Sequence, residues 1–197
     1  MHWAEYANQI GKAMADLHSP SLYALVLNLQ RARETGATVF TCGNGGSASN
    51  ASHLAQDLSK GTLVNGKPPL RTNCLCDNIS AVTAWANDEG YDCIFSEQLY
   101  TLGRKGDILL AISGSGNSEN VLNAVHAAHE LEMRTWGITG FDGGKLLSLA
   151  HRCVRVPSDD MGRAEAVHSI LFHWLVDALK EMPEAATAGA WCPGVEP

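Results

Sequence analysis

Apolar residues recur every three or four positions at the start of the chain, the spacing that lines one face of an α-helix. This spacing predicts a helix over residues 3–17, and it returns over residues 21–34 after a break at Ser19-Pro20. We therefore expect a pair of N-terminal helices. The apolar positions are Trp3, Tyr6, Ile10, Ala13 and Leu17 in the first helix, and Leu22, Leu25, Val26, Leu29 and Ala32 in the second.

Farther along, short apolar runs alternate with helical patterns. Strands that alternate with helices indicate a parallel sheet covered on both faces, and therefore an α/β fold. The expected strands cover residues 37–40, 71–76, 107–112, 135–139 and 153–156. The expected helices between and after them cover residues 47–59, 79–87, 91–102, 118–131 and, at the end, 164–181.

Two loops rich in glycine and serine each follow a strand-like run and each precede a helical pattern. They cover residues 41–49 and 113–118. Glycines let the backbone approach a ligand, and the start of a helix offers free N–H groups with partial positive charge. Serine hydroxyls add donors. Because ligands of such sheets bind beyond the strand ends, the two loops predict a site for a phosphorylated metabolite.

The first loop has other interpretations as well. Residues 43–48 match the dinucleotide fingerprint G-x-G-x-x-A, but the acidic residue expected ~20 positions later is missing, since Asp77 lies too far along. The loop has no lysine, so it is not a Walker loop, and it also fits a plain tight turn with positive φ. The second loop is rarer: Ser113, Ser115 and Ser118 lead into a helix start and predict an anion-binding nest.

Histidines and carboxylates on two predicted helices form the candidate chemical group. His53 and Asp57 are four residues apart and share one helix face. Glu165 and His173 differ by eight residues, roughly 80° on a helical wheel, so one broad face holds both. The four side chains together suit a divalent transition metal such as zinc. They equally suit acid–base chemistry without a metal.

The composition is that of a mildly acidic protein, with a net charge of −7 over 197 residues. An acidic balance argues against general nucleic-acid binding, and no apolar run approaches the ~18 residues of a membrane span. The six cysteines form no C-x-x-C pair, and the N-terminus lacks the basic and apolar regions of a secretory leader. We therefore expect a cytoplasmic protein with free cysteines and with no nucleic-acid or membrane partner.

Four motifs together resemble those of the sugar isomerase (SIS) domain family, and within it the bacterial phosphoheptose isomerases. The family's C-G-N-G-G-S motif is matched at residues 42–47 and its S-x-S-G-N-S motif at residues 113–118. Its T-G-x-x-G-G motif is matched at residues 139–144. The Asn-Asp pair that follows the second strand in the family is matched by Asn87-Asp88.

The resemblance implies a three-layer αβα sandwich with a parallel, flavodoxin-like sheet, N-terminal helices and a long C-terminal helix. It implies a homotetramer with sites between subunits. The activity it implies is an aldose–ketose isomerase that interconverts sedoheptulose 7-phosphate and D-glycero-D-manno-heptose 7-phosphate through an enediol. We expect residues 1–182 to form one SIS domain that includes the helical pair at 3–35, followed by a flexible tail at 183–197 that is rich in Ala, Gly and Pro.

The resemblance also assigns site residues. Ser113, Ser115 and Ser118 would hold the phosphate, and we expect Asp57 and His173 to be the acid–base pair, with Glu165 as the rival base. The other residues that would contact the substrate are Asn44, Gly45, Gly46, Ser47, Asn87, Asp88 and Gly114. The family's metal ligands, for a zinc ion, fall on His53, Asp57, Glu165 and His173.

The sequence departs from the family at four positions. The family usually has Glu where Asp57 stands, Gln where Glu165 stands, Thr where Gly114 stands and Arg where Gly61 stands. These departures motivate a second hypothesis, a non-catalytic module that binds a sugar phosphate or another protein. A nucleotide-dependent oxidoreductase is a third, and it rests only on the G-x-G-x-x-A match.

Overall fold

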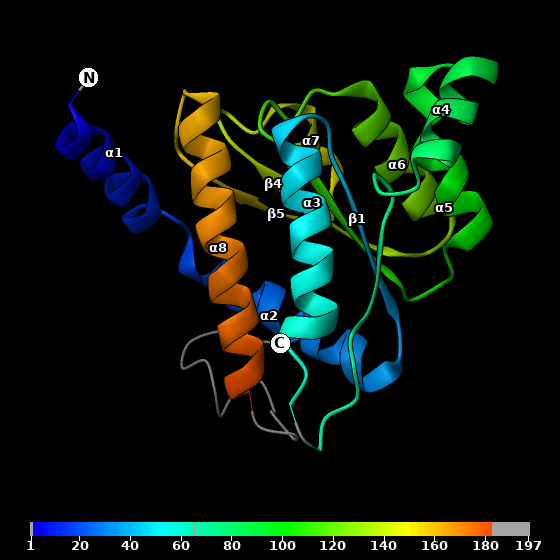
Figure 1. Cartoon of the computed structure of the whole chain (residues 1–197), viewed down its shortest axis with the longest axis horizontal. Coiled ribbons are helices and arrows are strands. Elements are labelled where there is room, and N and C mark those ends of the chain that lie inside the picture. The colour runs from blue at the N-terminus through cyan, green and yellow to red at the C-terminus, as the bar shows by residue number, and fades with distance from the viewer. Residues whose placement is uncertain (1, 65, 183–197) are drawn as a thin grey trace.

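All five strands expected from the sequence form, and they join a single parallel sheet (Figure 1). The computed structural model describes residues 2–64 and 66–182, so the predicted tail at 183–197 lies outside the described residues. The strands are β1 (Thr38–Cys42), β2 (Arg71–Cys74), β3 (Ile108–Ser113), β4 (Arg134–Thr139) and β5 (Arg152–Arg155). Their spatial order, β2-β1-β3-β4-β5, is flavodoxin-like and confirms the expected fold class.

The helices match the expected ones apart from a few differences. The helix expected over 47–59 is α-helical to Gln56 and continues as a π-helix at Asp57–Gly61. Ser19-Pro20 does not lie between helices but opens the second one, because proline fits the first turn of a helix. The helix expected over 91–102 is split into a 3₁₀ turn at Tyr91–Cys93 and a short α-helix, and one six-residue helix was not expected. The helices are α1 (Trp3–Ala15), α2 (Ser19–Thr35), α3 (Gly46–Gln56), α4 (Ile79–Asp88), α5 (Ser96–Leu102), α6 (Glu119–Glu130), α7 (Gly144–Leu149) and α8 (Met161–Glu181).

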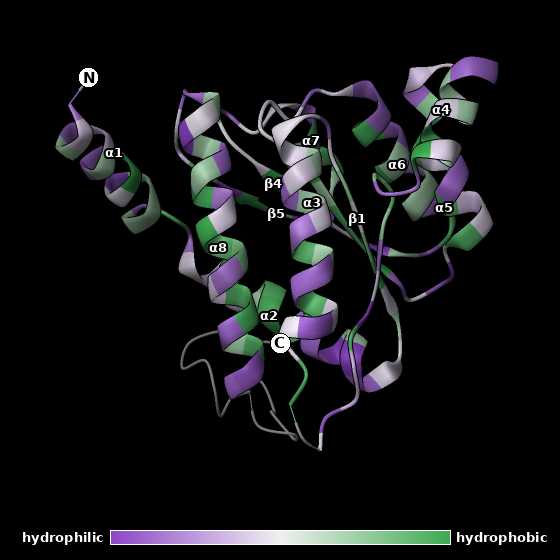
Figure 2. Ribbon diagram, viewed as in Figure 1, coloured by the Kyte–Doolittle hydropathy of each residue, from purple (hydrophilic) through white to green (hydrophobic). Residues whose placement is uncertain are grey.

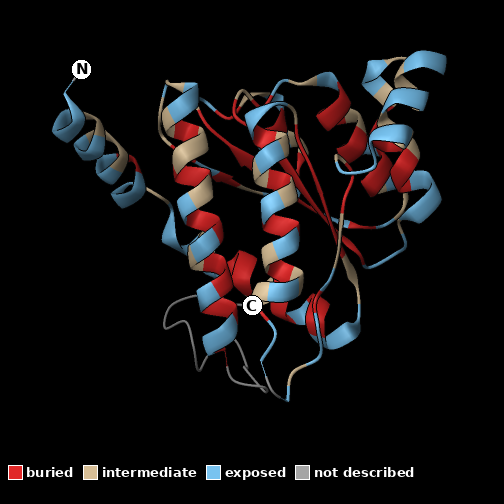
Figure 3. Cartoon of the chain, in the orientation of Figure 1, coloured by how far each residue is buried: buried red, intermediate tan, exposed pale blue. Residues whose placement is uncertain are grey.

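Apolar side chains on the two faces of the sheet form two separate cores. Along β3, Ile108, Leu110 and Ile112 face the core covered by α2, α3 and α8, whereas Leu109 and Ala111 face the core covered by α4, α5, α6 and α7. The strands are therefore buried between two helical layers (Figure 3), and the helices turn apolar stripes inward (Figure 2). No described helix is both long and apolar enough to cross a bilayer.

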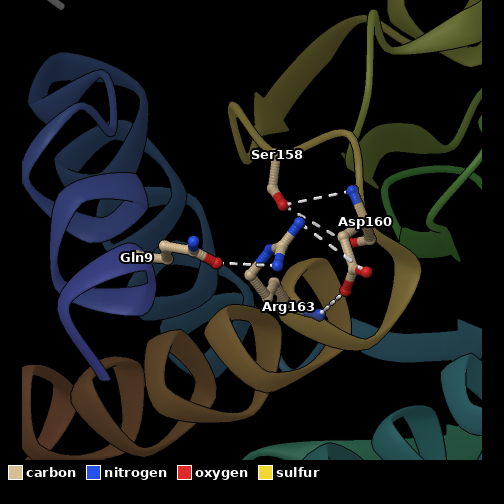
Figure 4. Close-up of polar contacts among 4 residues, drawn as sticks. All are labelled: Gln9, Ser158, Asp160 and Arg163. Carbon is tan, nitrogen blue, oxygen red and sulfur yellow. Dashed lines mark hydrogen bonds and ion pairs between the residues drawn. The ribbon is translucent and has the colours of Figure 1, made fainter. Parts of the chain in front are cut away.

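The start of α8 is fixed by a polar cluster that also reaches α1 (Figure 4). The Asp160 carboxylate accepts a hydrogen bond from the Arg163 backbone N–H at 2.9 Å and so caps the helix. The Arg163 guanidinium donates to the Gln9 side chain at 2.7 Å and lies 3.7 Å from the Asp160 carboxylate. This cap explains why α8 begins at Met161, three residues before the expected start at 164.

We expect Asp160→Ala to lower the free energy of unfolding by about 1 kcal/mol, because the first turn of α8 loses its side-chain cap. The neighbouring Asp159 is exposed and caps nothing, so Asp159→Ala is the matched control and is expected to change stability little. Urea denaturation followed by circular dichroism measures both. Equal effects of the two substitutions would contradict the capping role.

The His168 imidazole, on α8, is fully buried and contacts the end of β4. One ring nitrogen, Nε2, lies 3.0 Å from the Thr139 carbonyl oxygen, and the other has no hydrogen-bond partner among the described residues. Burial lowers the pKa of His168 from 6.5 to about 4, with the contact to Thr139 opposing the shift. His168 is therefore neutral in the folded protein at neutral pH.

This buried imidazole predicts a loss of stability in mild acid. Below pH 6.5 the unfolded chain binds a proton at His168 that the folded chain excludes until the pH reaches about 4, so stability falls as the pH drops through this window. The loss between about pH 7 and pH 5 is expected to be roughly 2 kcal/mol more in the wild type than in His168→Gln. Urea titrations at both pH values measure it, with His126→Gln, at an exposed position, as the control. The same pH dependence in wild type and His168→Gln would contradict the assignment.

Candidate active site

The strand order reverses between β1 and β3, and both glycine-rich loops lie at this point of the sheet. In flavodoxin-like sheets the crevice outside the carboxyl ends of these two strands is where ligands bind. The first loop joins β1 to α3 and the second joins β3 to α6. The fold therefore brings together the two loops that the sequence predicted to share one ligand.

In the second loop, residues 113–118, two serine hydroxyls accept hydrogen bonds from the loop's own backbone. We call this loop the nest, and its binding of an anion stays a prediction. Gly116, with φ of 66°, donates its N–H to the Ser113 hydroxyl at 3.1 Å, and Asn117 donates its N–H to the Ser115 hydroxyl at 3.2 Å. The Ser118 hydroxyl lies 3.4 Å from that of Ser113. Ser118 occupies the N-cap position of α6, as expected, but its side chain makes no capping hydrogen bond. Its hydroxyl is thus available to an anion at the start of the helix.

The segment that matches T-G-x-x-G-G, together with α7 that follows it, contacts the nest through backbone hydrogen bonds. The Gly140 N–H donates to the Gly114 carbonyl at 2.8 Å, and the Leu146 N–H donates to the Gly116 carbonyl at 2.9 Å. A Cβ on Gly116 would lie 1.9 Å from the Gly143 carbonyl oxygen, so the two loops touch through their backbones. The role of the third motif in this structure is therefore to position the nest.

In the first loop, Gly45 has φ of 55°, so the positive φ considered for this turn is present. Beside it, Asn44 and Asn120 exchange two side-chain hydrogen bonds, of 2.8 and 3.0 Å. The Tyr91 hydroxyl also donates to the Asn44 side chain, at 2.9 Å. Asn120 is buried and Tyr91 begins the 3₁₀ turn, and the sequence motifs singled out neither. Both hold Asn44 in place.

A cavity of about 300 Å³ lies between the two loops and α8. Glu165 enters it beside Gly46, where any Cβ would lie 2.3 Å from the carboxylate, so glycine at 46 makes room for this side chain. Met161 fills the space beside Gly114 in the same way, with its sulfur 2.2 Å from the position of a Cβ. Of the residues predicted to contact substrate, the cavity is lined by Asn44, Gly45, Gly46, Ser47, Ser113, Gly114, Ser115 and Ser118.

Two predicted substrate contacts lie elsewhere. Asn87 and Asp88 end α4, where both are exposed and the Asn87 amide donates to the Asp88 carboxylate at 2.7 Å. They do not line the cavity between the loops. The Tyr91 hydroxyl, just after α4, donates to Asn44 and so links this part of the chain to the first loop. The role of Asn87 and Asp88 stays a prediction.

Three of the four predicted metal ligands form one group. The Asp57 carboxylate lies 3.3 Å from His53 Nε2 and 3.5 Å from His173 Nδ1, and the two imidazole rings are 5.0 Å apart. One ligand atom from each residue lies within 4.8 Å of the others. Two imidazole nitrogens and a carboxylate oxygen are donors that suit zinc. Glu165, the fourth predicted ligand, lies outside this group and beside Gly46.

Helix geometry explains why Glu165 and His173 separate. Eight residues along α8 amount to about 12 Å of axial rise, and the seven residues from Gly46 to His53 on α3 amount to about 10 Å. The helices α3 and α8 run side by side (Figure 1). Glu165 therefore lies level with the cavity and His173 lies level with His53. Starting from the nest, these two helices therefore carry first the Glu165 carboxylate and then the group of His53, Asp57 and His173.

The two imidazoles of this group are accessible, whereas the carboxylate is mostly shielded. The exposed fractions are 50% for His53 and 58% for His173, against 18% for Asp57. A carboxylate shielded between two accessible imidazoles can exchange protons with a bound molecule. By contrast, burial raises the pKa of the Cys42 thiol at the end of β1, which makes this cysteine a protonated core residue rather than a nucleophile.

The sequence model of the SIS domain matches residues 2–140. The chain belongs to the SIS domain family. A phosphoheptose isomerase of Helicobacter pylori is 44% identical to this SIS protein over 147 residues, which cover 75% of the chain and 76% of the relative. One of Shewanella baltica is 45% identical over 145 residues, or 72% of the chain and 73% of the relative.

Solved structures agree with these relatives. The phosphoheptose isomerase GmhA of Neisseria gonorrhoeae superposes on this SIS protein with a TM-score of 0.83 and 35% identity, over 92% of this chain and 96% of that one. A phosphoheptose isomerase from Francisella tularensis gives a TM-score of 0.85 and 33% identity, over 91% and 95%. The family and the fold expected from the motifs are thus confirmed.

Proposed function

We propose that this protein is a sugar phosphate isomerase that interconverts sedoheptulose 7-phosphate and D-glycero-D-manno-heptose 7-phosphate. Relatives named phosphoheptose isomerase match most of the chain at 44% and 45% identity. The proposal depends on one arrangement. The serine nest lies where the strand order reverses between β1 and β3, and farther along α3 and α8 a carboxylate lies between two imidazoles. A phosphate-binding loop and a proton-transfer group that lie in one line suit an isomerase of phosphorylated sugars.

In this proposal the nest binds the phosphate of the substrate. Ser115 and Ser118 offer hydroxyl donors, and the start of α6 offers backbone N–H groups and a favourable dipole. The sugar chain then runs past Asn44, which the Asn120 and Tyr91 side chains hold in place. A seven-carbon chain is about long enough to extend from the nest toward His53 and His173, given the axial rises of about 10 Å along α3 and about 12 Å along α8.

The chemical step moves a hydrogen between C1 and C2. A base removes the proton from the carbon beside the carbonyl while an acid protonates the carbonyl oxygen, which gives the enediol. Loss of a proton from the other hydroxyl and return of a proton to the former carbonyl carbon complete the conversion. Asp57 and His173 are the proposed pair, because their side chains lie 3.5 Å apart and can pass a proton between them. Glu165 is the rival base.

His53, Asp57 and His173 would also hold a zinc ion, and Glu165 remains the fourth ligand proposed from the sequence. A bound zinc would polarise the substrate carbonyl and stabilise the negative charge that develops on its oxygen. Elemental analysis of the purified protein tests this. We expect about one zinc per chain in the wild type and a loss of most of it in His53→Ala. Equal zinc contents in the two proteins would contradict the assignment.

We also propose a homotetramer in the cytoplasm. The N-terminal α1 projects from the sheet (Figure 1) and leaves Trp3 80% exposed, and Ile170 on the accessible side of α8 is 40% exposed. Apolar surface of this kind supports an assembly that covers α1 and α8. The five described cysteines are free, as in a reducing compartment. Light scattering on the purified chain is expected to give four times the mass of one chain, and a monomer would contradict the assembly.

Incubation of the purified protein with sedoheptulose 7-phosphate tests the activity. We expect a heptose 7-phosphate aldose to appear and the reaction to run in both directions to one equilibrium. If the protein instead gains thermal stability from the sugar phosphate but converts none of it, the non-catalytic module is the better description. Stabilisation by NAD in place of the sugar phosphate would favour the oxidoreductase hypothesis.

A further inference from the structure

A second cavity, of about 730 Å³, opens at the opposite edge of the sheet, where the strands begin. We call it the amino-edge cavity. It lies between the end of α2, the loop that leads into β3, and the first residues of β3, β4 and β5. Its volume falls within the range typical of small-molecule sites. The positively charged residues that line it are Arg31, Arg104, Lys105, Arg134 and Arg152.

This concentration of positive charge is unusual for the molecule. The chain has 14 lysines and arginines against 21 acidic residues, yet five of those basic residues and one acidic residue line this cavity. That one carboxylate, of Asp107, is buried, and backbone N–H groups occupy both of its oxygens. Thr38 donates to one at 2.7 Å and Arg104 to the other at 2.9 Å. Asp107 therefore holds the loops together, and the five basic side chains against this one carboxylate leave the cavity with an excess of positive charge.

The arginines have few other partners. Lys105 pairs with Glu132 at 2.6 Å, and the Arg152 guanidinium lies 6.0 Å from the ring centre of Trp136. For Arg31, Arg104 and Arg134, no carboxylate partner lies among residues 2–64 and 66–182. Several guanidinium groups around one hollow repel one another, and a multiply charged anion between them relieves the repulsion.

We propose that the amino-edge cavity binds a small molecule with at least two phosphate groups. Each phosphate can take a bidentate contact from an arginine, and four arginines exceed what one phosphate engages. The lining has no aromatic residue, which disfavours a nucleobase and favours an inorganic polyphosphate or a sugar bisphosphate. The site is separate from the nest, because the six residues of β3 place its two ends about 20 Å apart.

Isothermal titration of the full chain with sodium tripolyphosphate, at constant ionic strength, tests this site. We expect a Kd on the order of 10–100 μM for the wild type and a rise of at least ~10-fold in the double variant Arg31→Gln, Arg134→Gln. Both side chains are exposed, so the unfolding midpoint is expected to stay unchanged. Should it fall, the pair Arg104→Gln, Arg152→Gln gives the same test.

Two controls locate the binding. Arg71→Gln removes one exposed arginine at the start of β2, on the same sheet edge but outside the cavity, and is expected to change the Kd less than ~2-fold. The double variant Ser115→Ala, Ser118→Ala alters the nest and is likewise expected to leave tripolyphosphate binding unchanged. No saturable binding, equal weakening by Arg71→Gln, or a loss that follows the serine variant would each overturn the proposal. So would orthophosphate binding as tightly as tripolyphosphate.

Discussion

Replacing Asp57 by asparagine is expected to lower kcat for sedoheptulose 7-phosphate by roughly 10²- to 10⁴-fold, the usual contribution of a general acid or base. Asparagine keeps the size of the side chain but can no longer accept a proton. His173→Ala removes the neighbouring imidazole, 3.5 Å away, and is expected to have an effect of the same order. Because the two groups act as a unit, the double variant should lose little more than either single one. Steady-state kinetics of the three variants measures this.

Matched controls separate chemistry from folding. Asp177→Asn and His126→Ala make the same kinds of change at exposed positions on α8 and α6, and both should retain wild-type kcat. Glu165→Gln tests the rival base: glutamine is equal in size, so a loss within ~10-fold is expected if Asp57 is the base. A large loss in Glu165→Gln together with wild-type activity in Asp57→Asn would transfer the role to Glu165.

Gly116→Ala is expected to weaken phosphate binding by the nest. The residue has φ of 66°, and its new Cβ would lie 1.9 Å from the Gly143 carbonyl oxygen, so residues 113–118 must move. Losing two charge-assisted hydrogen bonds to the phosphate would raise KM by about 100-fold. Backbone strain and the clash would lower the free energy of unfolding by about 2–4 kcal/mol. Rates measured over a range of sugar phosphate concentrations give KM, and urea denaturation gives the free energy of unfolding, so the two effects are separated.

Gly36→Ala is the control for Gly116→Ala. Gly36 ends α2 with φ of 72°, but a Cβ there would meet no atom within 4 Å. This variant therefore has the strain of positive φ without the collision, and is expected to lose about 1 kcal/mol of stability with KM unchanged. A KM in Gly116→Ala equal to that of Gly36→Ala would show that the nest does not bind the phosphate.

The sheet and both loops could be predicted from the sequence because their signals are local. An apolar run such as 107–112 followed by glycines and serines specifies a strand, a turn and a helix start within one stretch of chain. The six-residue α7 was missed because it is too short to show helical periodicity. Its N-cap, Gly143, has φ of 93°, which a sequence does not display.

The site was less predictable where it depends on contacts between distant segments. A helical wheel places Glu165 and His173 on one broad face but ignores the rise between them, so the four expected ligands separate into a group of three and a carboxylate beside Gly46. The pairing of Asn44 with Asn120 crosses 76 positions. Nothing local distinguishes Asn120 from a surface asparagine near a helix start.

A crystal structure of the protein with sedoheptulose 7-phosphate is the most direct test of the mechanism. We expect the phosphate to lie within hydrogen-bond distance of the Ser115 and Ser118 hydroxyls, and the carbonyl end of the sugar to lie beside Asp57 and His173. A phosphate bound away from residues 113–118, or a sugar whose carbonyl end points away from Asp57, would contradict it.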